Sequence, residues 1–236
     1  MARLPRLVLP DQPLHIMHRG NNRQNIFENE EDMTRILNDI GEALHKADCQ
    51  LHAYVIMTNH LHLLLTPKNK QELAVFMQSM ANRYVRYFNA NRQRTGTIWE
   101  GRFKSCLIDS DNYLFTLYKY IEMNPVKAEM VKDIKEYRWS SYHHNGLGEV
   151  DPLITEHPLY LNLAGTREER VTRYKSMMDK IALGKENQKI TDATIRGEAL
   201  GNENFQHWVC KKMDRPAVLK SHGGDRKSAK YQNQVG

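Results

Sequence analysis

The sequence has few cysteines and no long apolar run. Only three of its 236 residues are cysteine, Cys49, Cys106 and Cys210, and no two of them form a Cys-x-x-Cys pair. Such spacing argues against a disulfide framework and a cysteine-rich zinc site, and it fits a reducing compartment. No apolar segment approaches the roughly 20 residues of a membrane span, and the first residues lack the apolar centre of a signal peptide. We therefore expect a cytoplasmic protein with no membrane partner.

Basic residues outnumber acidic ones. The chain has 34 Lys and Arg against 28 Asp and Glu, which gives a net charge of +6 and an isoelectric point near 9.1. This excess suggests a polyanionic partner, with nucleic acid the leading candidate, although many basic proteins bind no nucleic acid. At 40% hydrophobic residues, the chain can build a core.

The hydrophobic pattern predicts alternating helices and strands. Strands are expected at 13–20, 51–57, 60–67 and 95–108, with Thr58 and Asn59 as the hairpin turn and Gly101 as a bend. Helices are expected at 30–49, along the stripe from Leu73 to Phe88, and at 109–125. This order predicts an α+β fold, with an antiparallel sheet, helices on one face and the other face free for a ligand.

Two histidines stand one residue apart in TNHLHLLLTP, residues 58–67. Side chains alternate along a strand, so His60 and His62 share one face while Leu61 and Leu63 share the other. Two imidazoles directed at one point could bind a metal ion, or they could be partly buried histidines without a ligand. Zinc is disfavoured, because neither an HExxH motif nor a cysteine set lies nearby.

The predicted helix that stops at Pro125 carries Tyr120 and Asn124 on one face, because they are four residues apart. Asn124 offers a carbonyl oxygen as a third ligand for Mg²⁺ or Mn²⁺, and Tyr120 offers a phenol that could attack phosphorus. Tyr118 lies about 200° around the helix from Tyr120, so the two cannot face the same metal ion. Taken singly, Tyr120 could instead be a residue at the core edge, and Asn124 the N-cap of the next helix.

Four blocks, in order along the chain, carry a family resemblance. They are HRGNNRQNIF, HAYVIMTNHLHLLL, GTIWEGRFKS and YKYIEMNPVKAEMV. The segment NHLHLLL resembles the His-hydrophobic-His motif of HUH endonucleases, and YIEMNPVKA resembles the tyrosine helix of single-tyrosine HUH transposases. Together, over roughly residues 10–145, the blocks resemble the REP-associated tyrosine transposases.

The resemblance implies a ferredoxin-like antiparallel sheet with both histidines on a central strand. It implies His60, His62 and Asn124 as ligands of Mg²⁺ or Mn²⁺, and Tyr120 as the nucleophile. It also implies a folded-back hairpin of single-stranded DNA, such as a REP-like repeat, as the substrate. Attack by Tyr120 would join the DNA to the protein through a 5′-phosphate and release a 3′-OH, so that strands could be rejoined without ATP.

Six residues of these blocks are assigned to DNA binding. Arginine can hold phosphates and asparagine can contact a base edge, and charge interleaved with an aromatic ring suits single strands. Ordinary solvated charge is the alternative for any one of them. The six are Arg19, Asn21, Asn22, Arg23, Arg102 and Lys104, the last two on one side of a strand around Phe103.

Three segments are expected: a catalytic domain at 1–145, a C-terminal helical extension at 146–214, and a disordered basic tail at 215–236. The extension could bind DNA through a helix–turn–helix unit with Gly201 at the turn, or it could serve oligomerisation. Monomer and homodimer are both left open. The DNA substrate makes the expected location cytoplasmic and nucleoid-associated.

Two other functions compete with a tyrosine transposase. One is a non-catalytic regulator that binds hairpin nucleic acid without metal. The other is a metallonuclease that uses water, in which Tyr120 is structural. The tyrosine–asparagine helix beside a histidine pair favours the transposase.

Overall fold

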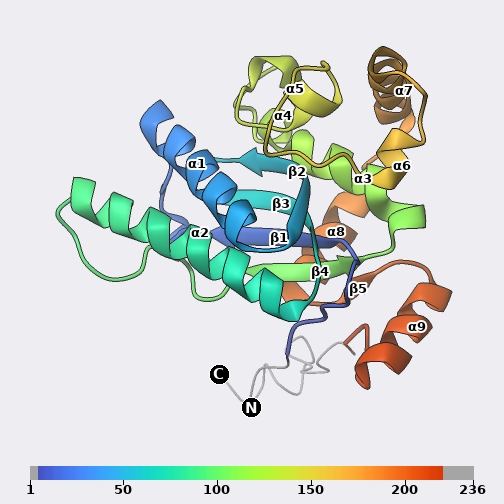
Figure 1. Ribbon diagram of the computed structural model, residues 1–236, viewed down its shortest axis with the longest axis horizontal. Helices are drawn as coiled ribbons and strands as arrows, with labels where there is room; N and C mark the ends of the chain where they lie inside the picture. Colours follow the sequence, from blue (N-terminus) through green and yellow to red (C-terminus); the bar gives the residue numbers. More distant parts are fainter. Residues whose placement is uncertain (1–4, 220–236) are drawn as a thin grey trace, which may run out of the picture.

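Five strands form one sheet in the computed structural model, which describes residues 5–219 (Figure 1). The order across the sheet is β2-β3-β1-β4-β5, and every neighbouring pair except the parallel β4 and β5 is antiparallel. The strands are β1 Leu14–Arg19, β2 Cys49–Ile56, β3 His60–Pro67, β4 Lys104–Ile108 and β5 Ala199–Leu200. The histidine pair thus lies on a central strand, and the α+β antiparallel prediction is confirmed.

Helices connect and flank these strands. The longer ones are α1 Glu30–Lys46, α2 Lys70–Asn91, α3 Ser110–Glu122, α7 Arg167–Lys180, α8 Glu186–Arg196 and α9 Glu203–Met213. The short ones are α4 Asn124–Lys127, α5 Tyr142–Asn145 and α6 Pro158–Leu161, with 3-10 turns at η1 Asn21–Arg23 and η2 Ile134–Glu136. The order β1-α1-β2-β3-α2-β4 is that of a ferredoxin-like unit.

Side-chain caps define where the two long helices of that unit begin. The side chain of Asn29 accepts from the backbone N–H of Asp32 at the start of α1. Asn69 accepts from the N–H groups of Gln71 and Glu72 at the start of α2. Each cap satisfies backbone donors that have no partner inside the helix. The polar residue before each apolar stripe therefore sets the helix start.

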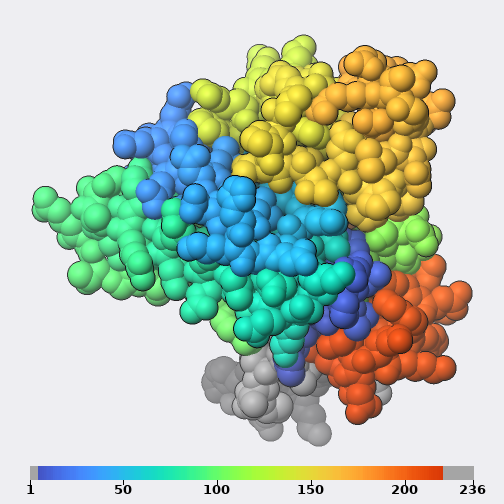
Figure 2. Space-filling view, in the orientation of Figure 1, coloured from blue at the N-terminus to red at the C-terminus, as the bar shows by residue number. Residues whose placement is uncertain are grey.

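Helices cover both faces of the sheet, so the prediction that they lie on one face is wrong in that detail. Helices α1 and α2 pack on the face of Leu61 and Leu63 and cover it in the space-filling view (Figures 1 and 2). Helices α3 and α8 lie on the opposite face, which is the face of the histidines. The apolar stripes of α3 and α8 need burial, and the apolar residues Val55, Leu64 and Ile108 of that face bury them.

The C-terminal extension is part of this sheet. Its strand β5 pairs with β4, and Gly201 follows β5 and precedes α9. Gly201 is therefore not at a turn between two helices. The division at residue 145 stays a prediction, and residues on both sides of it share one sheet. Most of the predicted basic tail, residues 220–236, lies outside the described residues.

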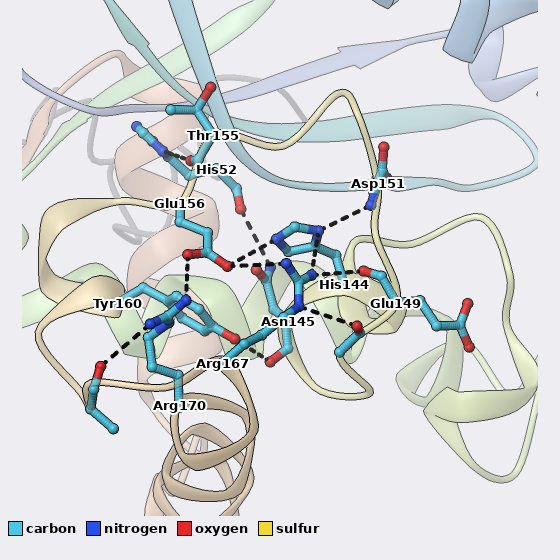
Figure 3. Close-up of polar contacts among 12 residues, drawn as sticks. His52, His144, Asn145, Glu149, Asp151, Thr155, Glu156, Tyr160, Arg167 and Arg170 are labelled. Atoms are coloured by element: carbon cyan, nitrogen blue, oxygen red, sulfur yellow. Dashed lines mark hydrogen bonds and ion pairs between the residues drawn. The ribbon is translucent and has the colours of Figure 1, made fainter.

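A buried polar cluster joins residues 142–170 to strand β2 (Figure 3). Glu156 stands at its centre, 3.4 Å from Nε2 of His144 and 3.3 Å from the guanidinium of Arg170. His52 of β2 bonds through Nδ1 to the carbonyl of Thr155 at 2.6 Å. These contacts join residues far apart in the sequence, across β2 and the segment before α7. The segment before α7 is therefore docked on the sheet.

The strand predicted at 95–108 is shorter in the structure. Regular pairing begins at Lys104, and residues 95–103 form an irregular segment in which Trp99 makes one isolated bridge to Gly20. Gly101 has φ +61°, a left-handed value that favours glycine and turns the chain. Among the described residues, no helix has the length and apolar character needed to cross a membrane.

Candidate active site

His60 and His62 lie side by side on β3 beneath α3. Their ring centroids are 4.9 Å apart and their planes stand at 82°. In the register of the sheet, Arg19 of β1 is opposite His60 and Met17 is opposite His62. His62 is buried and His60 is half-buried, so the pair opens toward solvent on the His60 side.

Hydrogen bonds determine which nitrogen of His60 carries the proton. Nδ1 of His60 lies 2.6 Å from Oδ1 of Asn59. The amide nitrogen of Asn59 donates to the carbonyl of Arg23 at 3.0 Å, so its oxygen is the acceptor. His60 therefore donates from Nδ1 and keeps a lone pair on Nε2, the form in which histidine binds metals.

A longer relay fixes the tautomer of His62. Thr194 of α8 donates its hydroxyl to the carbonyl of Ile190 at 2.7 Å, and its oxygen accepts from Nδ1 of His15 at 2.8 Å. Nε2 of a neutral His15 then accepts from Nδ1 of His62, also at 2.8 Å. Nε2 of His62 is thereby left unprotonated. Both histidines of the pair present the same nitrogen to a ligand.

Burial keeps these rings neutral. It lowers the pKa of His15 to about 3, and together with nearby Arg19 it lowers the pKa of His60 to about 4. It also lowers the pKa of His62 well below its usual value, and His60, His15 and Lys127 act in the same direction. At neutral pH all three imidazoles are therefore uncharged, as metal binding requires.

Tyr120 of α3 lies against the histidines. Its ring meets those of His15 and His62 edge-on, with centroids 5.5 and 5.7 Å away, and the residue is 7% exposed. Its hydroxyl lies 3.1 Å from Oγ1 of Thr191 in α8. Thr191 donates its own hydrogen to the carbonyl of Asn187 at 2.8 Å, so Tyr120 is the donor. Burial raises the pKa of Tyr120 and the Thr191 bond opposes this, which leaves a protonated phenol at neutral pH.

Tyr118 points away from the histidines, as its position on the helix predicts. It is fully buried, with ring centroids 6.5 Å from Tyr160 and 5.8 Å from Tyr174. Both partners come from the C-terminal extension, so Tyr118 packs between α3 and that extension. Of the two tyrosines weighed from the sequence, only Tyr120 stands beside the histidine pair. The assignment of Tyr120 as nucleophile stays a prediction.

Asn124 closes the end of α3 with its amide nitrogen. Nδ2 donates to the carbonyl of Tyr120 at 2.7 Å and to that of Ile121 at 3.3 Å. Its side chain makes no capping bond to α4, where Met123 holds the N-cap position, so the capping alternative does not describe it. Since Nδ2 is engaged with the helix end, Oδ1 is the atom that Asn124 can offer to a ligand.

Two cations border the site. Nζ of Lys127 lies 5.9 Å from the ring centroid of Tyr120, and Lys127 is exposed. Arg19, opposite His60, is held by Glu100, with Nε 2.6 Å from Oε2. Positive charge near a buried tyrosine suits a phosphate group.

The donor set fits a hard divalent ion that keeps water ligands. Within residues 5–219, no three His, Cys, Asp or Glu side chains are grouped to enclose a metal ion. Two imidazole nitrogens and one amide oxygen leave positions for water and phosphate oxygens, as Mg²⁺ and Mn²⁺ sites commonly have. His60, His62 and Asn124 are therefore compatible with such an ion, and their role as ligands stays a prediction.

The six residues assigned to DNA binding divide between two places. Arg19, Asn21, Asn22, Arg23 and Lys104 lie on the histidine face or in the loop that Asn59 ties to β3. Arg102 does not lie on a strand beside Lys104, because β4 begins only at Lys104. The bend at Gly101 turns Arg102 and Phe103 toward α2 on the other face.

Sequence patterns alone did not select four residues of the site: His15, Lys127, Thr191 and Thr194. The sequence could have indicated Lys127, because it follows Tyr120 by seven residues within a matched block and so falls on the same side of a helix. The other three depend on the strand register and on the docking of α8, which no local pattern specifies.

The chain is similar in sequence and in fold to known transposases. A family model described as "Transposase IS200 like" matches residues 10–124. A protein of Haemophilus influenzae, named as a REP-associated tyrosine transposase, is 31% identical over 135 residues, which are 51% of this chain and 76% of the relative. A solved structure of a REP-associated tyrosine transposase bound to a REP hairpin superposes with a TM-score of 0.53 at 17% identity. That match covers 67% of this chain and 93% of the other, and it shows a shared fold.

Proposed function

Since the chain belongs to the REP-associated tyrosine transposases, we propose that it cuts and rejoins single-stranded hairpin DNA through a covalent 5′-phosphotyrosine at Tyr120. In this proposal His60, His62 and Asn124 hold Mg²⁺ or Mn²⁺. The substrate is a folded-back strand of the kind that REP-like repeats form, bound by a protein associated with the nucleoid.

One observation carries the proposal. The ring of Tyr120, from α3, stands 5.7 Å from the ring of His62, from β3, on a face that also presents His60. A tyrosine and two imidazoles are thus brought together from distant parts of the chain. Either group alone has an ordinary structural explanation, but phosphoryl transfer needs both in one place.

The surrounding residues have distinct tasks. His15 and Asn59 hold the two histidines in the tautomer that binds a metal. Lys127 and Arg19 carry the positive charge that attracts and orients a phosphodiester. The bound ion would supply the positive charge that stabilises the phosphate oxygens as they become more negative during attack.

The reaction exchanges one phosphoester for another. The Tyr120 oxygen forms a bond to phosphorus, the bond from phosphorus to the 3′-oxygen breaks, and the phenol proton is balanced by the proton that the released 3′-OH gains. The strand is then linked to the protein by its 5′-phosphate. A second 3′-OH reverses these steps on another strand, so no water is consumed and no ATP is needed.

The test is the formation of a protein–DNA adduct. The protein is incubated with Mg²⁺ or Mn²⁺ and a single-stranded hairpin oligonucleotide, and the products are separated by denaturing electrophoresis. We expect an adduct with the parent chain and none with Tyr120→Phe, which keeps the ring. Tyr118→Phe is the matched control on the same helix, and it should form the adduct as the parent does.

The same experiment separates the competing functions. Cutting by Tyr120→Phe at the parent rate would make water the nucleophile. Hairpin binding without cutting by the parent, with either metal, would indicate a non-catalytic regulator. A perfect duplex of the same sequence should stay uncut, because a tyrosine on a packed helix needs its phosphate exposed by an unpaired strand.

A further inference from the structure

The loop that connects β1 to α1 has an unfavourable backbone conformation. Its residues 21–25 are exposed and polar and include no acidic side chain, and Asn21, Asn22 and Arg23 among them are assigned to DNA binding. Asn22 has φ +52° and Arg23 has φ +59°, so two consecutive residues other than glycine lie in the left-handed region. Such conformations persist only where the surrounding structure holds them. The loop therefore depends on contacts from outside it.

The turn between β2 and β3 supplies such contacts. The carbonyl of Asn59 accepts from the N–H of Gly20 at 2.8 Å, and the carbonyl of Thr58 accepts from the N–H of Ile26 at 3.0 Å. These two hydrogen bonds hold the ends of the loop. Between them, Nδ2 of Asn59 donates to the carbonyl of Arg23 at 3.0 Å. The side chain of Asn59 thus holds one of the two left-handed residues.

The same amide group also contacts the histidine pair. While Nδ2 of Asn59 bonds to the loop, Oδ1 accepts from Nδ1 of His60 at 2.6 Å, which leaves Nε2 of His60 unprotonated. An amide group is planar and rigid, so its two ends cannot move independently. A shift of the Arg23 carbonyl that turns the Asn59 side chain therefore also moves the oxygen that orients His60. One side chain links the conformation of the loop to a proposed metal ligand.

We propose that Asn59 is a positioning residue that couples DNA binding at residues 20–25 to metal binding at His60. DNA bound to the loop in this conformation stabilises the left-handed pair, holds the Arg23 carbonyl in place and so keeps Asn59 turned toward His60. The effect is reciprocal, because a coupling free energy acts equally on both ligands. This inference rests on the proposed function, whose metal ligand and DNA substrate it uses, and it adds that each ligand strengthens the binding of the other.

A purely structural role for Asn59 predicts a different result. If the amide only stabilised the turn, its removal would lower the affinities for metal and for DNA independently. A coupling residue changes a further quantity, which is the factor by which one ligand raises the affinity for the other. A general loss of affinity for either ligand cancels in that factor, so the factor distinguishes the two roles.

The factor is measured in the Tyr120→Phe background, in which no cutting is expected. The DNA probe is a fluorescent blunt hairpin that ends before the phosphate to be cut, so that a metal ion at the site cannot bridge protein and DNA. Titration calorimetry gives the Mn²⁺ affinity with and without saturating hairpin, and fluorescence anisotropy gives the hairpin affinity with and without saturating Mn²⁺. We expect each ligand to raise the affinity for the other about fivefold, by equal factors.

Three variants in the same background locate the coupling. Asn59→Ala keeps the backbone bonds of the turn, and we expect about tenfold weaker Mn²⁺ binding without DNA and a coupling factor near one. Asn59→Asp keeps an acceptor for His60, so Mn²⁺ binding without DNA should not weaken. Asn89→Ala is the matched control, because Nδ2 of Asn89 also donates to a loop carbonyl, that of Gly96 at 2.8 Å, away from the histidines. It should keep the fivefold factor.

Two results would overturn the inference. One is a coupling factor of one in the Tyr120→Phe chain itself, and the other is a factor in Asn59→Ala equal to that in Asn89→Ala. Adduct formation by the parent chain tests the proposed function and is scored separately. A parent that forms the adduct but shows no coupling refutes the role of Asn59 alone, whereas coupled binding without an adduct refutes only the proposed cutting.

Discussion

The protonation of one ring nitrogen in this protein depends on a threonine far along the chain. His15 and Thr194 are 179 residues apart, yet the hydroxyl of Thr194 accepts from His15, which in turn accepts from His62. Because Thr194 has committed its hydrogen to the carbonyl of Ile190, each hydrogen bond in the relay has one possible direction. Helix α8 therefore sets which nitrogen of His62 is left unprotonated.

Thr194→Val should weaken metal binding without removing a ligand. The change leaves Nδ1 of His15 without an acceptor, which allows His15 to turn and His62 to change tautomer. We expect Mn²⁺ affinity, measured by titration calorimetry, to fall about tenfold, as for other residues that orient a metal ligand. Thr172→Val makes the same change on an exposed face of α7 and should bind Mn²⁺ as the parent does. Equal Mn²⁺ affinity of the parent, Thr194→Val and Thr172→Val would show that the relay has no effect on metal binding.

The proposed ligands should differ in importance. His60→Ala or His62→Ala removes one of only two nitrogen donors, so we expect DNA cutting to be abolished while hairpin binding persists. Asn124→Ala should lower the cutting rate less, because water can replace a neutral oxygen ligand. Adduct yield at several Mn²⁺ concentrations distinguishes the cases. Normal cutting by either histidine variant would show that the pair is not catalytic.

At the scale of elements, α8 covers the tyrosine that the proposed reaction uses. Thr191 and Thr194 are three residues apart and both face the site, one accepting from Tyr120 and the other from His15. In the structure the hydroxyl of Tyr120 is held by this hydrogen bond to Thr191 and is mostly buried. Helix α8 therefore contacts both the relay to His62 and the hydroxyl of Tyr120, the proposed nucleophile.

Thr191→Val should release the restraint. Loss of the acceptor frees the Tyr120 hydroxyl, and one hydrogen bond of about 1 kcal/mol corresponds to a roughly fivefold faster initial rate of adduct formation. Quenched time courses with a hairpin oligonucleotide measure that rate. Thr172→Val makes the same change on an exposed face of α7 and should form the adduct at the parent rate. A slower rate in Thr191→Val would mean that Thr191 positions the tyrosine instead of restraining it.

Local patterns specified much of this architecture. The His60–His62 alternation and the separation of Tyr118 from Tyr120 around α3 follow from strand and helix periods, and the structure places these side chains accordingly. The sequence did not predict that helices would cover the second face of the sheet, because α8 contacts β4 and β1 through residues far away in the sequence. Strand register and helix docking depend on nonlocal packing, so His15 and Thr194 had no local signal.

At the scale of the whole molecule, buried neutral histidines make stability depend on pH. Burial lowers the pKa of His52 to about 4, against a small opposing effect of the Thr155 carbonyl. Between pH 6.5 and about 4 the unfolded chain thus binds a proton at His52 that the folded protein does not, so stability falls as pH falls. Glu122, with its pKa raised by burial to about 7, acts in the opposite direction, and its contribution is lost as pH rises through 7.

His52→Gln should reduce the acid sensitivity. Gln can donate to the Thr155 carbonyl but takes up no proton, so we expect the parent to lose about 1–2 kcal/mol more stability than the variant between pH 7.5 and 5. Urea unfolding followed by circular dichroism at both pH values gives the difference. An equal loss in the two chains would show that His52 takes up its proton in the folded state too.

The relay from His62 to Thr194 also has a consequence for the order of events during synthesis. A ribosome delivers His15 first, the histidine pair next, Tyr120 later and Thr194 near the end of the described chain. Strands β1 to β4 can pair before that, since domains form from the N-terminus as they emerge. The hydrogen bond that sets the tautomer of His62 through His15 and the hydrogen bond to Tyr120 both form only once α8 has been made. A nascent chain that stops before α8 has the histidines and the tyrosine, but it lacks both the threonine that completes the relay to His62 and the threonine that accepts from Tyr120.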